Sequence, residues 1–167
     1  LRVKSKLWTG VMTSVDSLQS SRYALLRSYR RDGTPVDTPI WFHLDGESLV
    51  FRTKTGPKTA RVKAHPQVEL RPCDHKGRTT GDVPAITGVA QVLSGADAQR
   101  ADDRLHRRYG WQYNVIPLVK IPGVTNVHSG LPLREKLRRA RAREVWPDSA
   151  IVRVDLDSDN DLYQVQV

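Results

Sequence analysis

Two Asp-Gly pairs, Asp32-Gly33 and Asp45-Gly46, constrain the fold of this chain more than any other feature of its sequence. Asp-Gly is a preferred two-residue β-hairpin turn, because such turns need a positive φ. The segment between the pairs, 36–44, alternates as a strand does, with one side made of Val36, Thr38, Ile40, Phe42 and Leu44. We therefore predict three strands, over 23–30, 36–44 and 48–53, that follow one another as a meander.

Pro39 lies inside the second of these strands and cannot donate a ladder hydrogen bond, so we expect an edge position or a bulge there. Pro57 predicts a helix over 57–64, since the first helical position does not need its N–H. The helix should stop before Pro66.

The remaining segments predict three more strands and two longer helices. We expect strands over 67–71, 85–93 and 150–156, and a helix from a cap at Asp97 to Tyr109, ended by Gly110. The apolar stretch 111–120 predicts a helix or turn, and 162–167 a short strand. We expect residues 1–21 to form an arm with a short helix, and 121–144 a loop followed by a basic helix over 134–144. The whole, 1–167, is predicted to be one domain: a mainly β protein with flanking helices, built as a six-stranded barrel.

Charge and cysteine content narrow the class of protein. The 167 residues carry a net charge of +9, which favours an anionic partner. Cys73 is the only cysteine, so no internal disulfide is possible, and a reducing compartment fits; we expect a cytoplasmic protein without a membrane span. The five histidines show no pair with helical metal-site spacing, and we predict no metal.

The order of these elements resembles the pyridoxamine 5'-phosphate oxidase-like split β-barrels, and more closely their deazaflavin-dependent branch from actinobacteria. The matching stretches are GTPVDTPIWF at 33–42, FRT at 51–53, KTARV at 58–62, HPQV at 65–68, PCDHKGR at 72–78 and YGWQY at 109–113. The resemblance implies a homodimer with two cofactor sites at its interface. It also implies a flavin-type ring against the second and third strands, and a cofactor phosphate near the third strand and the helix after it.

The residues that precede and open this helix suit a phosphate. Arg52, Thr53 and Thr55 lead into the helix, Lys58 lies in its first turn and Arg61 one turn later. A helix N-terminus presents free N–H groups and positive potential, and arginine and lysine add charge-assisted hydrogen bonds. The alternative is a solvated basic helix.

For the ring, the resemblance implies contacts from Thr38, Pro39, Ile40 and Trp41. Trp41 points off the apolar side of its strand, so it either stacks on a ligand or fills the dimer interface. Trp111 and Tyr113 are predicted to reach the cofactor of the other subunit, or to pack in the dimer core.

The predicted function follows from the resemblance: an oxidoreductase that transfers a hydride between reduced deazaflavin coenzyme F-420 and an unknown small organic substrate. The phosphate and anionic oligoglutamate tail of this coenzyme suit a basic groove, and FMN is the main alternative cofactor. No catalytic side chain stands out, because in such enzymes the cofactor carries the hydride chemistry.

Two other functions remain open from the sequence. One is a non-catalytic flavin or tetrapyrrole binder of the same fold. The other is a nucleic-acid-binding module, which the basic segment 134–144 raises; the absence of a helix-turn-helix, zinc-finger or ribonucleoprotein motif argues against it, and we expect no nucleic acid partner. With Leu137, Ala140 and Val145 on one side, the same segment resembles a lid or a dimer-packing element.

Overall fold

The computed structural model describes residues 14–79, 83–120 and 128–157. Within them, the strands are β1 (Tyr23–Tyr29), β2 (Pro35–Trp41), β3 (His43–Asp45), β4 (Ser48–Lys54), β5 (Gln67–Cys73), β6 (Ile86–Leu93) and β7 (Ser149–Leu156). The helices are α1 (Ser14–Gln19), α2 (Pro57–Ala64), α3 (Gly95–Tyr109), α4 (Gln112–Val115), the 3-10 turn η1 (Ile116–Leu118) and α5 (Leu133–Arg141). The first part of the predicted arm and the strand predicted over 162–167 lie outside the described residues.

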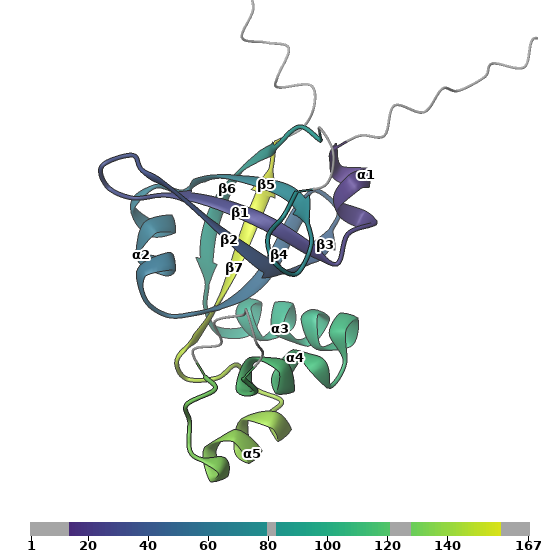
Figure 1. Ribbon diagram of the computed structural model, residues 1–167, viewed down its shortest axis with the longest axis vertical. Helices are drawn as coiled ribbons and strands as arrows, with labels where there is room; N and C mark the ends of the chain where they lie inside the picture. The colour runs from purple at the N-terminus through teal and green to yellow at the C-terminus, as the bar shows by residue number, and fades with distance from the viewer. Residues whose placement is uncertain (1–13, 80–82, 121–127, 158–167) are drawn as a thin grey trace, which may run out of the picture.

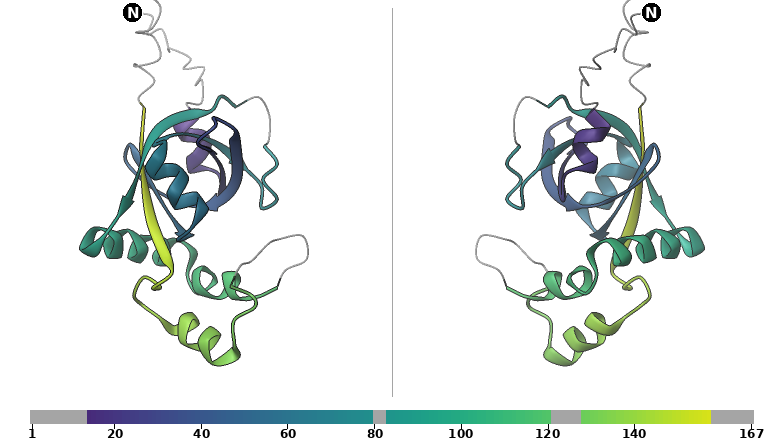
Figure 2. Two further views of the ribbon diagram at one scale, coloured as in Figure 1. Left: turned by 90° about the vertical axis from the view of Figure 1, so that its left-hand side faces the viewer. Right: turned by 90° about the vertical axis from the view of Figure 1, so that its right-hand side faces the viewer.

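All the strands form one antiparallel sheet in the order β2-β1-β5-β6-β7-β4-β3. The two edge strands, β2 and β3, are separated in the chain by a single residue, Phe42. A sheet whose opposite edges are joined so closely must curl, and Figure 2 shows the strands bending round into a ring. The expected mainly β fold with flanking helices is therefore confirmed.

The strand count differs from the predicted six because the expected strand 36–44 is divided at Phe42. Its first part pairs with β1, with Ala24 opposite Ile40, and its last part pairs with β4, with His43 opposite Val50. Seven strands result, although the order of the predicted meander is kept. Pro39 lies in β2, an edge strand, as its missing N–H required.

The main hydrophobic core fills the interior of the curled sheet. Fully buried side chains from strands throughout the sheet meet there, including Leu26, Phe42, Phe51 and Leu70. Leu18 of α1 and Val62 of α2 belong to the same cluster, and these two helices lie at opposite sides of the strands in Figure 1. α2 has the predicted bounds, and its Pro57 is at the first position.

A second cluster lies on the outer side of the sheet, where α3 packs against β4 and β7. Its members include Val50, Leu105, Tyr113 and Ile151. The cap of α3 is Ser94 rather than the predicted Asp97, so the helix begins at Gly95, and it ends before Gly110 as expected. α4, η1 and α5 continue away from the barrel below α3 (Figure 1). Among the described helices, none combines the length and apolar character that a membrane crossing requires.

Candidate functional site

The chain leaves β4 through Thr55 and Gly56 and enters α2 at Pro57. The buried Thr59 fixes the first turn of α2 through two hydrogen bonds. The Gly56 N–H donates to the Thr59 hydroxyl oxygen at 3.0 Å, and the hydroxyl donates to the Gly56 carbonyl at 2.8 Å. Helix geometry leaves the N–H groups of Lys58 and Thr59 without intrahelical acceptors. The start of α2 is thus rigid and rich in donors.

Lys58 and Arg61 make no ion pair with any described residue. Lys58 is half-buried, and burial, reinforced by the charge of Arg61, lowers its pKa to about 8. Burial also lowers the pKa of Arg61, helped by Arg30, and the Arg61 Nε donates to the buried Ser28 hydroxyl at 3.1 Å. Positive charge that is partly removed from water and lacks a carboxylate makes this end of the barrel a favourable place for an anion.

Arg52, which was predicted to join this group, points to the opposite face of β4. Its guanidinium lies between two rings, 3.7 Å from the Tyr113 ring centre and 4.2 Å from that of Trp146. It donates to the Asn114 side-chain oxygen at 2.9 Å and to the Tyr113 carbonyl. Strand alternation explains this, because Arg52 shares its face with Val50 of the outer cluster.

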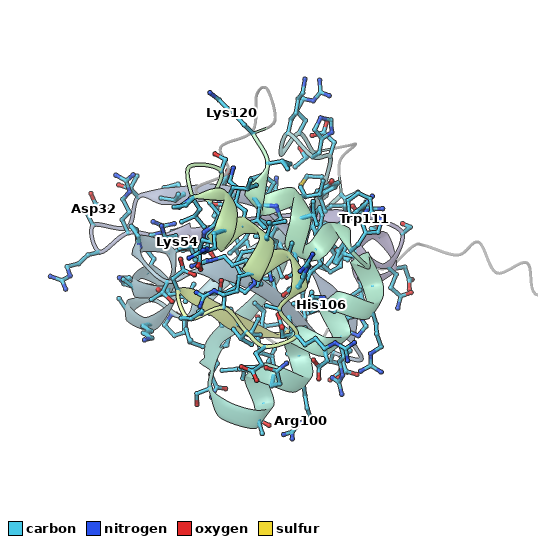
Figure 3. The ribbon with its side chains drawn as sticks, turned by 90° about the horizontal axis from the view of Figure 1, so that it is seen from below. Asp32, Lys54, Arg100, His106, Trp111 and Lys120 are labelled. Carbon is cyan, nitrogen blue, oxygen red and sulfur yellow. The ribbon has the colours of Figure 1, made fainter. Side chains whose placement is uncertain are left out.

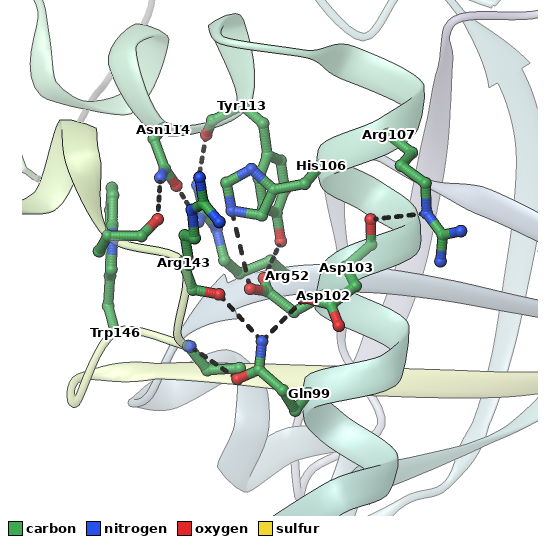
Figure 4. Close-up of polar contacts among 12 residues, drawn as sticks. Arg52, Gln99, Asp102, Asp103, His106, Arg107, Tyr113, Asn114, Arg143 and Trp146 are labelled. Atoms are coloured by element: carbon green, nitrogen blue, oxygen red, sulfur yellow. Dashed lines mark hydrogen bonds and ion pairs between the residues drawn. The ribbon is translucent and has the colours of Figure 1, made fainter.

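Beside Arg52 lies a buried carboxylate, Asp102 of α3, which is 0% exposed (Figure 4). The Tyr113 hydroxyl donates to its Oδ1 at 2.6 Å, whereas Oδ2 has no hydrogen-bond partner and lies 3.8 Å from the His106 Nε2. Burial raises the pKa of Asp102 and lowers that of His106. Burial also raises the pKa of the Tyr113 hydroxyl, so that it remains a donor at neutral pH.

Trp41, predicted to lie beneath a ring, already has ring partners within the chain. It stacks on Tyr109 with centroids 4.6 Å apart and meets the edge of Tyr23 at 6.1 Å. The Tyr109 hydroxyl accepts from the Phe42 N–H at 2.9 Å and lies 2.8 Å from the Phe42 carbonyl oxygen. Tyr109 thus holds the point at which β2 ends and β3 begins.

The other predicted site residues fall into separate surroundings. Thr38 is half-buried, Pro39 exposed and Ile40 buried along β2. Thr53 is half-buried at the end of β4, and the exposed Thr55 donates its N–H to the Asp148 carbonyl at 2.8 Å. Trp111, the N-cap of α4, is 69% exposed, whereas Tyr113 is buried.

Sequence reasoning missed four members of the polar cluster around Arg52: Asp102, His106, Asn114 and Trp146. A signal existed for Asp102, because it lies on the apolar stripe of α3 with Ala98, Ala101 and Leu105. A carboxylate on such a stripe must be buried and must find a partner. Asn114 and Trp146 had no comparable signal, since they depend on where α4 and the chain before β7 are placed.

The sequence also matches a family model. The model described as Pyridoxamine 5'-phosphate oxidase matches residues 13–146, most of the chain. The chain belongs to the pyridoxamine 5'-phosphate oxidase family. No curated protein matches this sequence.

Solved structures share the fold of this pyridoxamine 5'-phosphate oxidase family member at low sequence identity. HutZ, the heme storage protein from Vibrio cholerae, aligns with a TM-score of 0.54 and 11% identity over 84% of each chain. A conserved hypothetical protein from Mycobacterium tuberculosis aligns with a TM-score of 0.53 and 18% identity over 86% of this chain and 78% of that one. An FAD-binding protein from Mesorhizobium loti aligns with a TM-score of 0.51 and 15% identity over 87% of this chain and 88% of that one.

Two basic residues of α2, one in its first turn and one in its last, suit a cofactor that carries a phosphate. Lys58 and Arg61 supply two cations without carboxylate partners, and a phosphate supplies the missing negative charge. Among the described residues, no three His, Cys, Asp or Glu side chains gather as a metal site requires. A pair of cations of this kind suits a phosphate group.

Proposed function

We propose that this chain is a cofactor-dependent oxidoreductase that transfers a hydride between reduced deazaflavin coenzyme F-420 and a small organic substrate. The observation that carries the proposal is the pair Lys58, in the first turn of α2, and Arg61, in its last turn: both charges are partly buried, and neither has an ion pair among the described residues. The net charge of +9 supports a cofactor that adds an anionic oligoglutamate tail to its phosphate.

In this proposal, the chain positions the coenzyme, and the bound coenzyme supplies the hydride chemistry. Lys58, Arg61 and the first N–H groups of α2 hold the phosphate, with Thr53 and Thr55 at the entrance. Thr38, Pro39, Ile40 and Trp41 line the ring site along β2. The protein is a homodimer, and Trp111, with most of its ring exposed, extends toward the partner's cofactor.

Arg52 and Tyr113 have a supporting role within this proposal. Arg52 donates to Asn114 and so holds α4 against β4, and the Tyr113 hydroxyl donates to Asp102 and so holds α4 against α3. We therefore propose that Arg52 and Tyr113 support the site from the outer face of the sheet. The phosphate is then held without the Arg52 guanidinium.

Two alternatives use the same site. FMN also carries a phosphate and would use the same cations. A non-catalytic flavin or tetrapyrrole carrier is the second alternative, which the fold shared with the heme storage protein HutZ favours. Binding alone cannot separate a carrier from an enzyme, so turnover must be measured as well.

The proposal is tested by titrating the purified protein with coenzyme F-420 and with FMN while following tryptophan fluorescence. The variants are Lys58→Ala and, as a matched control, Lys63→Ala, which removes an exposed lysine from the same helix. Loss of one charge-assisted hydrogen bond costs about 1.5–3 kcal/mol, so Lys58→Ala should weaken binding roughly 10- to 150-fold. Lys63→Ala should bind like the wild type.

The outcomes separate the candidates. Tight binding of F-420 with weak binding of FMN, together with oxidation of reduced F-420 by an added acceptor, supports the proposal. Tighter binding of FMN assigns the protein to the flavin alternative. Binding without turnover over a panel of electrophilic acceptors favours the carrier, and no binding of either coenzyme contradicts the redox function.

A further inference from the structure

On helix α5, apolar side chains face outward and charged side chains face the protein, which is the opposite of an ordinary surface helix. Its two leucines face outward: Leu133 is 73% exposed and Leu137 is 50% exposed. Its charged residues Glu135 and Arg139 face the protein, and the Arg139 side chain is only 11% exposed. A surface helix normally buries its apolar stripe, so the exposed leucines of α5 indicate a face that contacts something else.

The contacts of Arg139 fix this orientation. Its guanidinium is 2.6 Å from the Asp148 carboxylate and 2.9 Å from that of Glu135, and lies over the Trp146 ring at 5.1 Å. The Trp146 indole N–H donates to the Arg139 carbonyl at 3.2 Å. Turning the leucines inward would break the contacts of Arg139 with Asp148 and Trp146, so these contacts hold the apolar residues at the surface.

The outward face of α5 combines these leucines with arginines. Positions three and four apart share one side of a helix, and a shallow hollow on this side is lined by Leu133, Arg134, Leu137, Arg138, Arg141 and Ala142. α5 lies farthest from the barrel in Figure 1 and stands in front when the molecule is seen from below in Figure 3. Nothing in the described chain covers this face.

The charge around α5 selects an anionic occupant. The stretch 111–144 contains seven lysines and arginines but only two acidic residues, so it carries more than half of the net charge of +9. A second copy presenting the same face would bring like charges together. A nucleic acid would use the arginines but gain nothing from Leu133 and Leu137.

A folded protein partner is disfavoured by size. A nine-residue helix is about 13 Å long, and a stable protein interface buries about 800 Å² on each partner. A lipid surface needs only a short amphipathic face, because apolar side chains enter the headgroup boundary while basic ones stay at the lipid phosphates. We propose that α5 docks the protein on an anionic membrane surface, with Leu133 and Leu137 inserted and Arg134, Arg138 and Arg141 at the headgroups.

The test is sedimentation of the full-length protein with phosphatidylcholine vesicles that either contain or lack phosphatidylserine. The proposal predicts binding to the vesicles with phosphatidylserine, weakened by salt, and little binding to those without it. Each arginine contributes about fivefold near such a surface, so Arg138→Glu with Arg141→Glu should weaken binding on the order of 30-fold or more. Leu133→Ser with Leu137→Ser should weaken it at least about tenfold.

Matched controls change the same properties elsewhere. Val89→Ser removes an exposed apolar side chain from β6, and Arg100→Glu with Arg107→Glu makes the same change of net charge on α3. Val89→Ser should bind vesicles within about twofold of wild type. Arg100→Glu with Arg107→Glu lowers the net charge, and its binding should differ from wild type only by that general effect and by no more than about twofold in addition. The altered residues are exposed, and exposed ion pairs such as that of Arg138 with Glu135 contribute little to stability, so all variants should melt within about 4 °C of the wild type.

Three results would overturn the proposal. One is equal binding to both kinds of vesicle, or binding that the α5 changes leave intact. Another is a dimer that Leu133→Ser with Leu137→Ser converts to a monomer in sedimentation velocity, which would assign the face to a second copy. The last is absent vesicle binding together with salt-dependent binding of a DNA duplex that survives loss of the leucines. None of these outcomes depends on the proposed redox function.

Discussion

Replacing Arg52 with methionine should destabilise the fold and leave the phosphate site in place. Arg52 donates to the Asn114 side-chain oxygen and the Tyr113 carbonyl, in a position where water cannot readily replace it. Each acceptor left without a donor costs about 1–3 kcal/mol, and loss of the two ring contacts adds about 0.5–1 kcal/mol each. Methionine refills part of the space and returns about 1–2 kcal/mol of apolar burial.

The net loss in the free energy of unfolding is then between about 1 and 7 kcal/mol, centred near 4 kcal/mol. For a chain of this size, 1 kcal/mol shifts the melting temperature by about 2–4 °C, so a loss of about 4 kcal/mol lowers it by about 8–16 °C. The assay is thermal unfolding followed by circular dichroism, with urea unfolding to give the free energy. Arg52→Lys keeps the charge but not the flat fork of donors, so it should recover only part of the loss.

The same variant separates a structural role from a cofactor role. If Arg52 holds α4 in place, coenzyme binding by folded Arg52→Met at low temperature should remain within about tenfold of wild type. A variant that melts within about 2 °C of wild type but loses coenzyme binding by 100-fold would refute this reasoning and return Arg52 to the phosphate site.

Three further predictions follow from the described contacts. Tyr109→Phe removes the acceptor of the Phe42 N–H and should cost about 1–3 kcal/mol in urea unfolding. Gly88→Ala places a Cβ 2.7 Å from the Asp155 carbonyl oxygen and should cost about 1–3 kcal/mol by the same measurement. The affinity for a phosphate-bearing ligand should fall as pH rises above about 8 in fluorescence titrations, because the pKa of Lys58 is about 8 and the neutral amine no longer attracts the anion.

Each of these predictions has a control. Tyr23 is half-buried, and its hydroxyl makes no hydrogen bond to another described residue, so Tyr23→Phe should stay within about 0.5 kcal/mol of wild type. Gly130→Ala meets nothing within 4 Å and should be equally mild. Lys58→Ala should abolish the pH dependence near 8. Wild-type stability in Tyr109→Phe or Gly88→Ala, or an unchanged pH profile in Lys58→Ala, would contradict the corresponding prediction.

The barrel was predictable because local signals and the long-range arrangement agree there. Pro57 and the proline at 66 bracket α2 at its observed bounds, and Pro39 lies on an edge strand as its missing N–H demands. The break at Phe42 was not predictable, because it depends on Tyr109, a residue far along the chain whose hydroxyl binds the backbone at that point.

The polar cluster around Arg52 was not predictable from the sequence. Alternation along β4 separates Arg52 from Thr53, but only the later placement of α4 determines which of the two faces is covered. Helical spacing in the basic segment grouped Leu137 with Ala140, whereas Leu137 is half-exposed on the outward face. That orientation follows from the ion pair of Arg139 with Asp148, which no local sequence pattern predicts.

A crystal structure of the protein with bound coenzyme F-420 tests the proposed phosphate site most directly. We predict that the coenzyme phosphate contacts the Lys58 ammonium and the first N–H groups of α2, with Arg61 close by. We also predict that Arg52 remains between Tyr113 and Trp146. A phosphate bound by Arg52, or a coenzyme located away from the start of α2, would contradict the proposed phosphate site.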